Sequence, residues 1–302
     1  MGGGFGSKRL LGNYAQFAVA LSRQARAPVR LCLDRDEEQV DSGNRPAVWQ
    51  KIRLGARRDG TLSALAVESY GTAGVALGAG IGNFAESLYS CANFQSSQSD
   101  VFTNAGPGCA MRGPGNTPGA FGLEQTIDEL AERLNIDPLV LRDHIDPSQV
   151  RREERRIGAQ RIGWDRRHAT GADAGPVKRG MGMAQSFWNA NVQVNASCEV
   201  RILRDGSVEI LSSVQDIGTG ISTVLAQTVA EVLGLAPGQI TVRIGDTDFP
   251  AGPPSHGSRT TASITPPART AAWRVLNMLL REAAPRLNAA PDDLAAKGGR
   301  IF

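Results

Sequence analysis

A glycine-rich turn at residues 215–220, Gln-Asp-Ile-Gly-Thr-Gly, constrains the fold of this chain more than any other stretch. A strand-like run, 207–214, leads into it, and a helix-like run, 221–233, leads out of it. The first backbone N–H groups of a helix have no partner within the helix, and the helix dipole adds partial positive charge there. We therefore expect a strand–turn–helix unit whose turn can bind a phosphate.

Two other stretches carry the same chemistry. Residues 2–8 read Gly-Gly-Gly-Phe-Gly-Ser-Lys, and residues 258–263 read Ser-Arg-Thr-Thr-Ala-Ser. The first stretch is neither a P-loop nor a Rossmann fingerprint, because its glycine spacing differs and no strand precedes it. Taken alone, a tight turn without a ligand explains the first stretch or residues 215–220 equally well. Together, the three stretches predict one large, phosphate-bearing cofactor held between them.

The composition is that of an ordinary globular protein. The 302 residues are 41% hydrophobic and 21% charged, which suggests about two domains. The net charge of +3 is too small and too scattered to argue for nucleic acid. No apolar run reaches membrane-spanning length, so no membrane association is expected. The four cysteines and three histidines are dispersed, and we expect no metal site formed by protein ligands.

Hydrophobic periodicity predicts an α+β fold, with two mixed α/β modules packed around a shared cofactor cleft. Each module contains a hairpin around Arg-Asp-Gly, at 53–70 and at 198–214. Residues 71–82 and 104–119 are expected to be loops, and residues 34–39 a polar turn or short helix. Further strands are expected at 29–33 and 240–244. Helices are expected up to about Arg23 and at 117–134, 139–144, 221–233 and 266–282, the second capped by Thr117.

Five motifs occur in a specific order: residues 2–8, Met-Arg-Gly-Pro-Gly at 111–115, residues 215–220, Gly-Asp-Thr-Asp at 245–248, and Gly-Ser-Arg-Thr-Thr-Ala-Ser at 257–263. In this order the chain resembles the molybdenum-cofactor subunit of the xanthine dehydrogenase/aldehyde oxidase family of molybdenum hydroxylases. The resemblance runs from Gly2 to about Ala272. It implies a first molybdopterin-binding domain at 1–146, truncated at its N-terminus, and a second at 180–302, truncated at its C-terminus. Residues 147–179 would connect them as a solvated helix plus linker.

The resemblance also implies a set of cofactor-binding residues. The main chain of the first motif would lie beside the molybdenum, and the main chain of Arg112 would approach the same centre. The turn after Gln215 would grip the pterin and its phosphate, and the motif near Ser263 would form a third cradle. The metal itself would be held by the dithiolene sulfurs of the pterin. The implied residues are Gly3, Gly4, Phe5, Gly6, Arg112, Ile217, Gly218, Thr219, Ala262, Ser263 and Thr265.

The chemistry implied by the resemblance is hydroxylation of an electron-poor carbon with water as the oxygen source. The molybdopterin would be a mononucleotide or a cytosine dinucleotide, and electrons would leave through iron–sulfur and FAD centres on partner chains. Purine-oxidising members carry an acidic residue where this chain has Arg9, and an aromatic residue where it has Pro114. We therefore expect an aldehyde or a small N-heteroaromatic as substrate. The resemblance implies a cytoplasmic location, or a periplasmic one if a partner carries an export signal.

The chain departs from the family in one respect that bears on catalysis. The general base of the family is a glutamate in a Gly-x-Gly-Glu motif, and no such motif occurs before Phe302. No catalytic residue is therefore assigned, and the isolated chain is expected to be inactive without the remainder of the large subunit. Two alternatives stay open: a non-catalytic cofactor-binding or assembly partner, and an unrelated phosphate-binding protein.

Overall fold

The computed structural model describes residues 3–9, 11–76, 78, 84–189 and 191–302. The chain divides into two compact units. We call Leu10–Trp188 the continuous unit, and Met1–Arg9 together with Asn189–Phe302 the split unit. In this division the first nine residues group with the second half of the chain.

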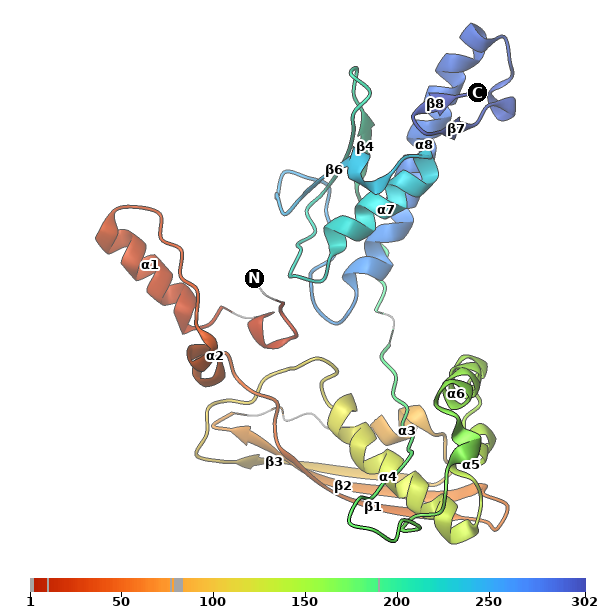
Figure 1. Ribbon diagram of the computed structural model, residues 1–302. Helices are drawn as coiled ribbons and strands as arrows, with labels where there is room; N and C mark the ends of the chain where they lie inside the picture. Colours follow the sequence, from red (N-terminus) through yellow and green to blue (C-terminus); the bar gives the residue numbers. More distant parts are fainter. Residues whose placement is uncertain (1–2, 10, 77, 79–83, 190) are drawn as a thin grey trace. The chain divides into compact units, whose positions relative to one another are not determined.

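The continuous unit is built on a three-stranded sheet of β1 (Val48–Ala56), β2 (Leu62–Gly74) and β3 (Phe94–Phe102). β1 and β2 are antiparallel and joined at the predicted Asp59-Gly60 turn, where Gly60 has a φ of +92° that favours glycine. β3 runs parallel to β2. The helices α3 (Phe84–Leu88) and α4 (Asn116–Leu134) cover the sheet (Figure 1). Leucine and isoleucine side chains of α4 share the hydrophobic core of this unit with Leu65 and Val67 of β2.

Side-chain capping sets the start of α5 but not that of α4. α4 begins at Asn116 behind Gly115, and not at the predicted Thr117 cap. α5 (Pro138–Ile145) begins at the predicted Asp-Pro pair, and Asp137 Oδ1 accepts a hydrogen bond from the N–H of Leu139 at 2.7 Å. The predicted helices near the start are also present, as α1 (Asn13–Ala25) and α2 (Arg35–Asp41).

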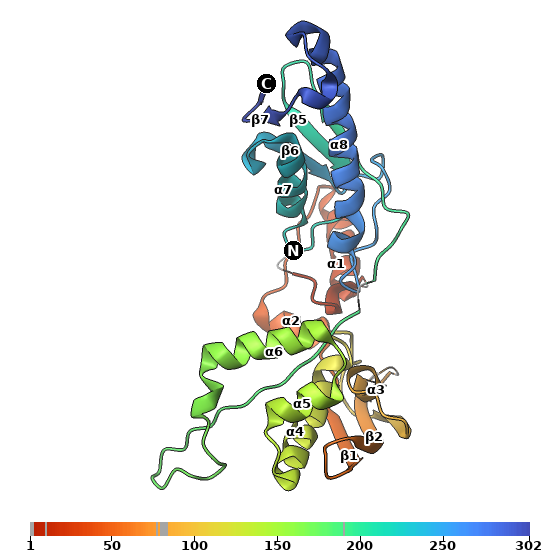
Figure 2. The same ribbon diagram turned by 90° about the vertical axis from the view of Figure 1, so that its right-hand side faces the viewer.

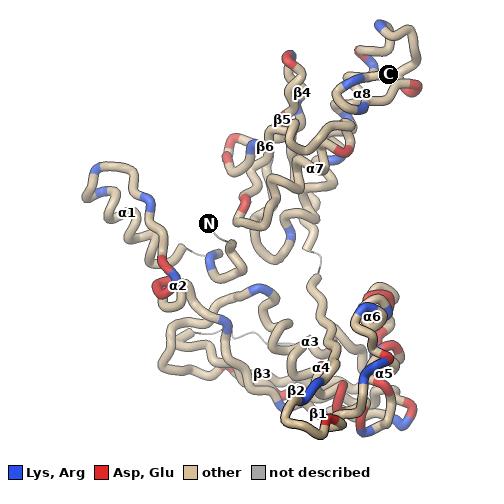
Figure 3. Tube along the Cα trace, in the orientation of Figure 1, with Lys and Arg blue, Asp and Glu red and all other residues tan. Residues whose placement is uncertain are grey.

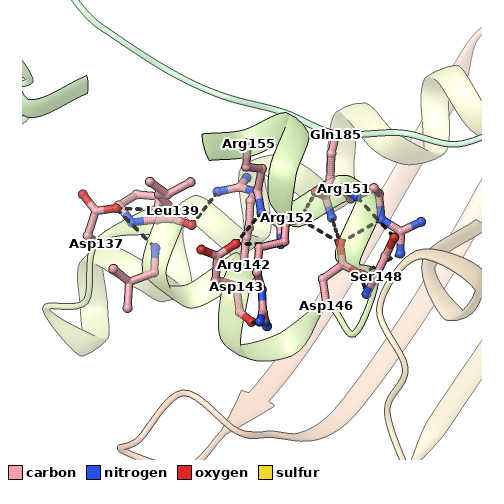
Figure 4. Close-up of polar contacts among 12 residues, drawn as sticks. Asp137, Leu139, Arg142, Asp143, Asp146, Ser148, Arg151, Arg152, Arg155 and Gln185 are labelled. Carbon is pink, nitrogen blue, oxygen red and sulfur yellow. Dashed lines mark hydrogen bonds and ion pairs between the residues drawn. The ribbon is translucent and has the colours of Figure 1, made fainter. Parts of the chain in front are cut away.

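The segment expected to be a solvated helix and linker is tied to the continuous unit. Its helix α6 (Gln149–Ile162) is mostly exposed, but the Arg155 side chain is only 6% exposed. The buried Asp146 carboxylate accepts hydrogen bonds from Arg151 at 2.6 Å, Arg155 at 2.8 Å and Gln185 at 3.0 Å (Figure 4). Burial alone would raise the pKa of Asp146, but these donors hold it well below its usual range. The network fixes α6 to the end of α5.

The split unit contains a second three-stranded sheet, of β4 (Glu199–Ile202), β5 (Val208–Ser212) and β6 (Ile240–Ile244). α7 (Ile221–Leu233) and α8 (Thr260–Leu287) lie side by side against it (Figures 1 and 2). α7 has the predicted bounds and ends at Gly234, where a Cβ would lie 2.3 Å from the carbonyl oxygen of Ala296. A short hairpin of β7 (Ala296–Lys297) and β8 (Arg300–Ile301) follows. Short 3₁₀ helices lie at Ser7–Arg9, Trp164–Arg166, Pro237–Gln239 and Pro291–Asp293.

Some predicted elements are wrong. The strand expected at 29–33 is absent: residues 28–34 form no strand pairing with any described residue. β3 was not predicted, and β2 continues to Gly74 into the expected 71–82 loop, of which residues 77 and 79–82 lie outside the described residues. α8 begins at Thr260, ahead of the predicted start, and continues through Pro266 and Pro267.

Charges of both signs are interspersed along the described chain, for example over α5 and α6 (Figure 3). α6 carries five arginines and two glutamates, although the net charge of the whole chain is only +3. None of the helices that the structure describes combines the length and the apolar character needed to span a membrane.

Candidate functional site

The loop at Gly3–Gly6 lies against the second glycine-rich turn, within the split unit. Gly3 and Gly6 have φ values of +100° and +106°, which favour glycine. A Cβ on Gly4 would lie 3.1 Å from Cδ1 of Ile217, so the main chain approaches that side chain closely. Phe5 has a φ of +48° and is 55% exposed. The structure therefore brings two of the predicted motifs together, although they are far apart in the sequence.

The turn at residues 215–220 is already filled by a carboxylate of the chain itself. Asp216 Oδ1 accepts hydrogen bonds from the N–H groups of Gly218, Thr219 and Gly220 at 2.9, 3.2 and 3.3 Å. Burial would raise the pKa of Asp216, but the backbone donors in this turn and at Ser222 lower it. A phosphate can therefore reach these N–H groups only by displacing the Asp216 carboxylate.

The third predicted motif forms the loop before α8 and the first turns of that helix. Ser263 is 3% exposed, and its Oγ donates to the Arg259 carbonyl at 2.7 Å and accepts from the N–H of Gln193 at 2.9 Å. Thr265 Oγ1 donates to the Thr261 carbonyl at 2.9 Å. Ala262 is half-buried. The two hydroxyl groups thus stabilise the helix and the adjoining segment in this structure.

Arg259 offers a side-chain donor that sequence analysis did not single out. It occupies the N-cap position of α8, without capping the helix through its side chain. Its Nε is buried and has no hydrogen-bond partner among the described residues. A buried donor without a partner is costly, and a guanidinium suits a phosphate group. The residue lies inside the third motif, so the motif located it, but its burial could not be inferred from the sequence.

Two more residues missed by the sequence analysis hold the loops of the split unit together. Ser255 Oγ donates to the Gln215 carbonyl at 3.0 Å, which joins the loop before α8 to the second turn. Asn191 Nδ2 donates to the Gly257 carbonyl at 2.9 Å. Both contacts join residues distant in sequence, and no local pattern signals them.

Arg112 belongs to the continuous unit, whereas the other predicted cofactor-binding residues belong to the split unit. It is exposed, and its carbonyl accepts a hydrogen bond from Arg45 Nη2 at 2.6 Å. Nη1 of the same arginine donates to the Gly113 carbonyl at 3.4 Å. Arg45 therefore fixes the main chain of this motif. The side chain of Arg9 lies outside the described part of the chain.

No group of three or more His, Cys, Asp and Glu side chains that could hold a metal ion occurs among the residues that the structure describes. The donors gathered in the split unit are backbone N–H groups, hydroxyls and one guanidinium. These groups suit an organic, anionic ligand better than a bare metal ion.

Comparison with family models decides the classification. Residues 1–144 match the model of a molybdopterin cofactor-binding domain, and residues 158–302 match a second model of that description. Only residues 145–157 lie outside the two matches. The chain belongs to the molybdopterin cofactor-binding domain family. The family suggested by the five ordered motifs is thereby confirmed.

Named relatives of this molybdopterin-binding chain are molybdenum-binding subunits. It is 35% identical over 277 residues to the aldehyde oxidoreductase molybdenum-binding subunit PaoC of Escherichia coli, covering 85% of this chain and 37% of that protein. It is 27% identical over 329 residues to a xanthine dehydrogenase molybdenum-binding subunit of Escherichia coli, covering 100% of this chain and 44% of that protein. The chain thus spans less than half the length of these relatives.

Solved structures show the same fold. Quinoline 2-oxidoreductase from Pseudomonas putida matches with a TM-score of 0.78 at 23% identity, over 100% of this chain and 43% of that one. The aldehyde oxidoreductase from Desulfovibrio desulfuricans matches with a TM-score of 0.72 at 25% identity, over 93% of this chain and 34% of that one. The mixed α/β architecture expected from the sequence is confirmed.

Proposed function

We propose that this chain is the molybdopterin-binding portion of a molybdenum hydroxylase, which hydroxylates aldehydes or N-heteroaromatics with water as the oxygen source. The observation that carries the proposal is the packing of Gly4 against Ile217, because it joins two motifs of a molybdopterin-binding family in one unit. The relatives named as molybdenum-binding subunits support an enzyme over a non-catalytic partner.

The residues present fit such a cofactor. A Cβ on Gly4 would make a tight contact of 3.1 Å with Cδ1 of Ile217, so glycine lets the main chain of the first loop lie close to the second turn. The buried Arg259 Nε, without a partner among the described residues, suits the phosphate of the pterin. The bound cofactor would supply the metal centre for oxygen transfer. The protein would bind and orient it through Gly3, Gly4, Phe5 and Gly6, the turn at Ile217–Thr219, residues Ala262, Ser263 and Thr265, and the main chain of Arg112.

The finer assignments belong to the same proposal. The nucleotide would be a mononucleotide or a cytosine dinucleotide, with iron–sulfur and FAD centres on partner chains. The two cofactor-binding domains would be 1–146 and 180–302. Arg9 and Pro114 occupy the positions where purine-oxidising members carry an acidic and an aromatic residue. We therefore propose an aldehyde or a small N-heteroaromatic as the substrate of the completed enzyme. It would work in the cytoplasm or, if exported with a partner, in the periplasm. The isolated chain would have no catalytic activity.

The test is the pterin and molybdenum content of the chain purified from molybdate-fed cells. Wild type should retain both, and Arg259→Gln should bind the cofactor about 10–100-fold more weakly, because it loses a charge-assisted hydrogen bond. Arg269→Gln is the matched control: it lies on the same helix, is 62% exposed and forms only a surface ion pair with Glu231. The proposal is contradicted if the wild-type chain contains no pterin, or if wild type, Arg259→Gln and Arg269→Gln contain equal amounts of it. With the remaining subunits present, benzaldehyde should turn over faster than hypoxanthine.

A further inference from the structure

An open apolar groove of about 740 Å³ lies in the continuous unit between α1, residues 28–34 and α2. Its walls include Phe17 and Leu21 of α1, Leu31 and Leu33 of the extended segment, and Val40 of α2. Phe17 is 59% exposed and Val40 is 85% exposed. Neither helix buries a single residue. Apolar side chains gathered in this way mark an interaction surface.

The middle wall of the groove has the pattern of a strand without a partner. Val29, Leu31 and Leu33 alternate with other residues, which is why the sequence predicts a strand here. Leu31 and Leu33 both line the groove and Cys32 between them does not, as expected for an extended chain. Residues 28–34 pair with no described strand. The segment can therefore receive an added strand by main-chain hydrogen bonding.

The rim of the groove is acidic, and one of its carboxylate oxygens is buried with no partner among the described residues. Asp36, Glu37 and Asp41 all border it. Asp41 Oδ1 accepts a hydrogen bond from Asn13 Nδ2 at 2.8 Å, whereas its Oδ2 is buried and has no partner in the described part of the chain. A bound segment that brings a lysine, an arginine or an N–H group would satisfy this atom.

The occupant follows from the length of the relatives and from the charge. The chain covers only 37% and 44% of the two molybdenum-binding subunits to which it was compared, so more than half of such a subunit lies outside it. A second copy fits poorly, because a two-fold contact through this groove would bring the acidic rims of both copies together. α2, which forms one wall of the groove, is stabilised at its start by a complete capping box between Asp34 and Glu37.

We propose that this groove docks the remainder of the large subunit, through an extended apolar segment that pairs with residues 28–34 and places a basic residue at Asp41. This inference rests on the proposed function, because it takes the chain to be part of such a subunit. It explains why the predicted strand is missing and why the faces of α1 and α2 are unburied.

The experiment uses the full 302-residue chain and, as a separate polypeptide, each part of the Escherichia coli PaoC subunit that lies outside the region similar to this chain. One part should bind, and amide hydrogen exchange of residues 29–33 should slow on binding. Leu31→Asp should weaken binding at least about 100-fold, because it places a charge inside an apolar contact. Asp41→Asn should weaken it about 10-fold. Val19→Asp is the control: it is 54% exposed on α1, does not line the groove and should change binding less than about 3-fold.

Several outcomes would overturn the inference: no binding by any part, equal binding by Leu31→Asp and wild type, or binding without protection of residues 29–33. A dimer of the chain alone that Leu31→Asp abolishes would assign the groove to self-association instead. Circular dichroism checks that each variant is folded. Pterin content is measured separately. If the chain binds a PaoC part through the groove but contains no pterin, only the proposed function is refuted. If the chain contains pterin but binds no part through the groove, only this inference is refuted.

Discussion

Asp216 determines whether the second glycine-rich turn is open to an anion. The glycines at 218 and 220, with φ values of +91° and +83°, are visible in the sequence as a turn before a helix. The sequence does not reveal that the neighbouring aspartate folds back onto their N–H groups. Likewise, the motif located Ser263, but its hydrogen bond with the N–H of Gln193 depends on tertiary packing. The sequence therefore shows where the main chain needs the conformations that glycine allows. It does not show which distant groups a side chain contacts.

Asp216→Ala is predicted to loosen this turn in a pH-dependent way. The pKa of Asp216 is lowered in the folded protein, so its stabilising effect is present above the unfolded pKa of about 3.9 and is lost as pH falls through the folded pKa. Loss of a cap of this kind costs about 1 kcal/mol. At pH 7 the amides of residues 218–222 should therefore exchange about fivefold faster in the variant. The difference should shrink below pH 4, and a difference independent of pH would refute the role of the carboxylate.

Secondary-structure elements were predicted well where the pattern was local. Both Arg-Asp-Gly hairpins and helix α7 are present, because turn residues and apolar periodicity specify them within the element. β3 was missed: its sequence, Phe-Gln-Ser-Ser-Gln-Ser-Asp-Val-Phe, has few apolar residues, and its pairing with β2 makes it a strand. The predicted strand at 29–33 failed for the opposite reason, because no described strand pairs with it.

One buried arginine links α5 to α4 through hydrogen bonds. Arg142 is fully buried and donates to Glu124 at 3.0 Å and to Asp128 at 2.7 Å, while Tyr89 donates to the other Glu124 oxygen at 2.7 Å. Burial would lower the pKa of Arg142, but Glu124, Tyr89 and Asp128 together raise it. Both oxygens of Glu124 and the guanidinium of Arg142 therefore have hydrogen-bond partners. Such a network holds α4 and α5 in one orientation.

Arg142→Met should destabilise the continuous unit by about 3–5 kcal/mol, because it leaves the Glu124 carboxylate buried without its cation. Urea unfolding followed by circular dichroism measures the change. Arg156→Met is the control, since Arg156 is 61% exposed and pairs with Glu153 on the surface of α6, and it should cost less than about 0.5 kcal/mol. Adding Glu124→Gln to Arg142→Met should recover part of the loss. Equal effects of the two arginine variants would show that the buried network contributes little.

At the scale of the whole molecule, the two units repeat one order of elements. Each has two antiparallel strands, a helix, a third strand parallel to the second, and a further helix: β1-β2-α3-β3-α4 and β4-β5-α7-β6-α8. The shared hairpin turns hinted at two related modules. The grouping of residues 1–9 with the split unit could not be foreseen, because it depends on contacts such as that of Gly4 with Ile217.

Since each unit has a hydrophobic core of its own residues, we predict two separable unfolding transitions. Leu123 and Leu225 are fully buried, the first in the core of the continuous unit and the second in that of the split unit. Truncating either leucine to alanine should cost about 2–5 kcal/mol, which lowers the midpoint of the affected transition by at least about 5 °C. In scanning calorimetry, Leu123→Ala should shift one transition and Leu225→Ala the other. Deleting residues 1–9 should lower the transition that responds to Leu225→Ala and leave the other in place, because those residues belong to the split unit. A single transition shifted equally by all three changes would mean that the chain unfolds as one cooperative body.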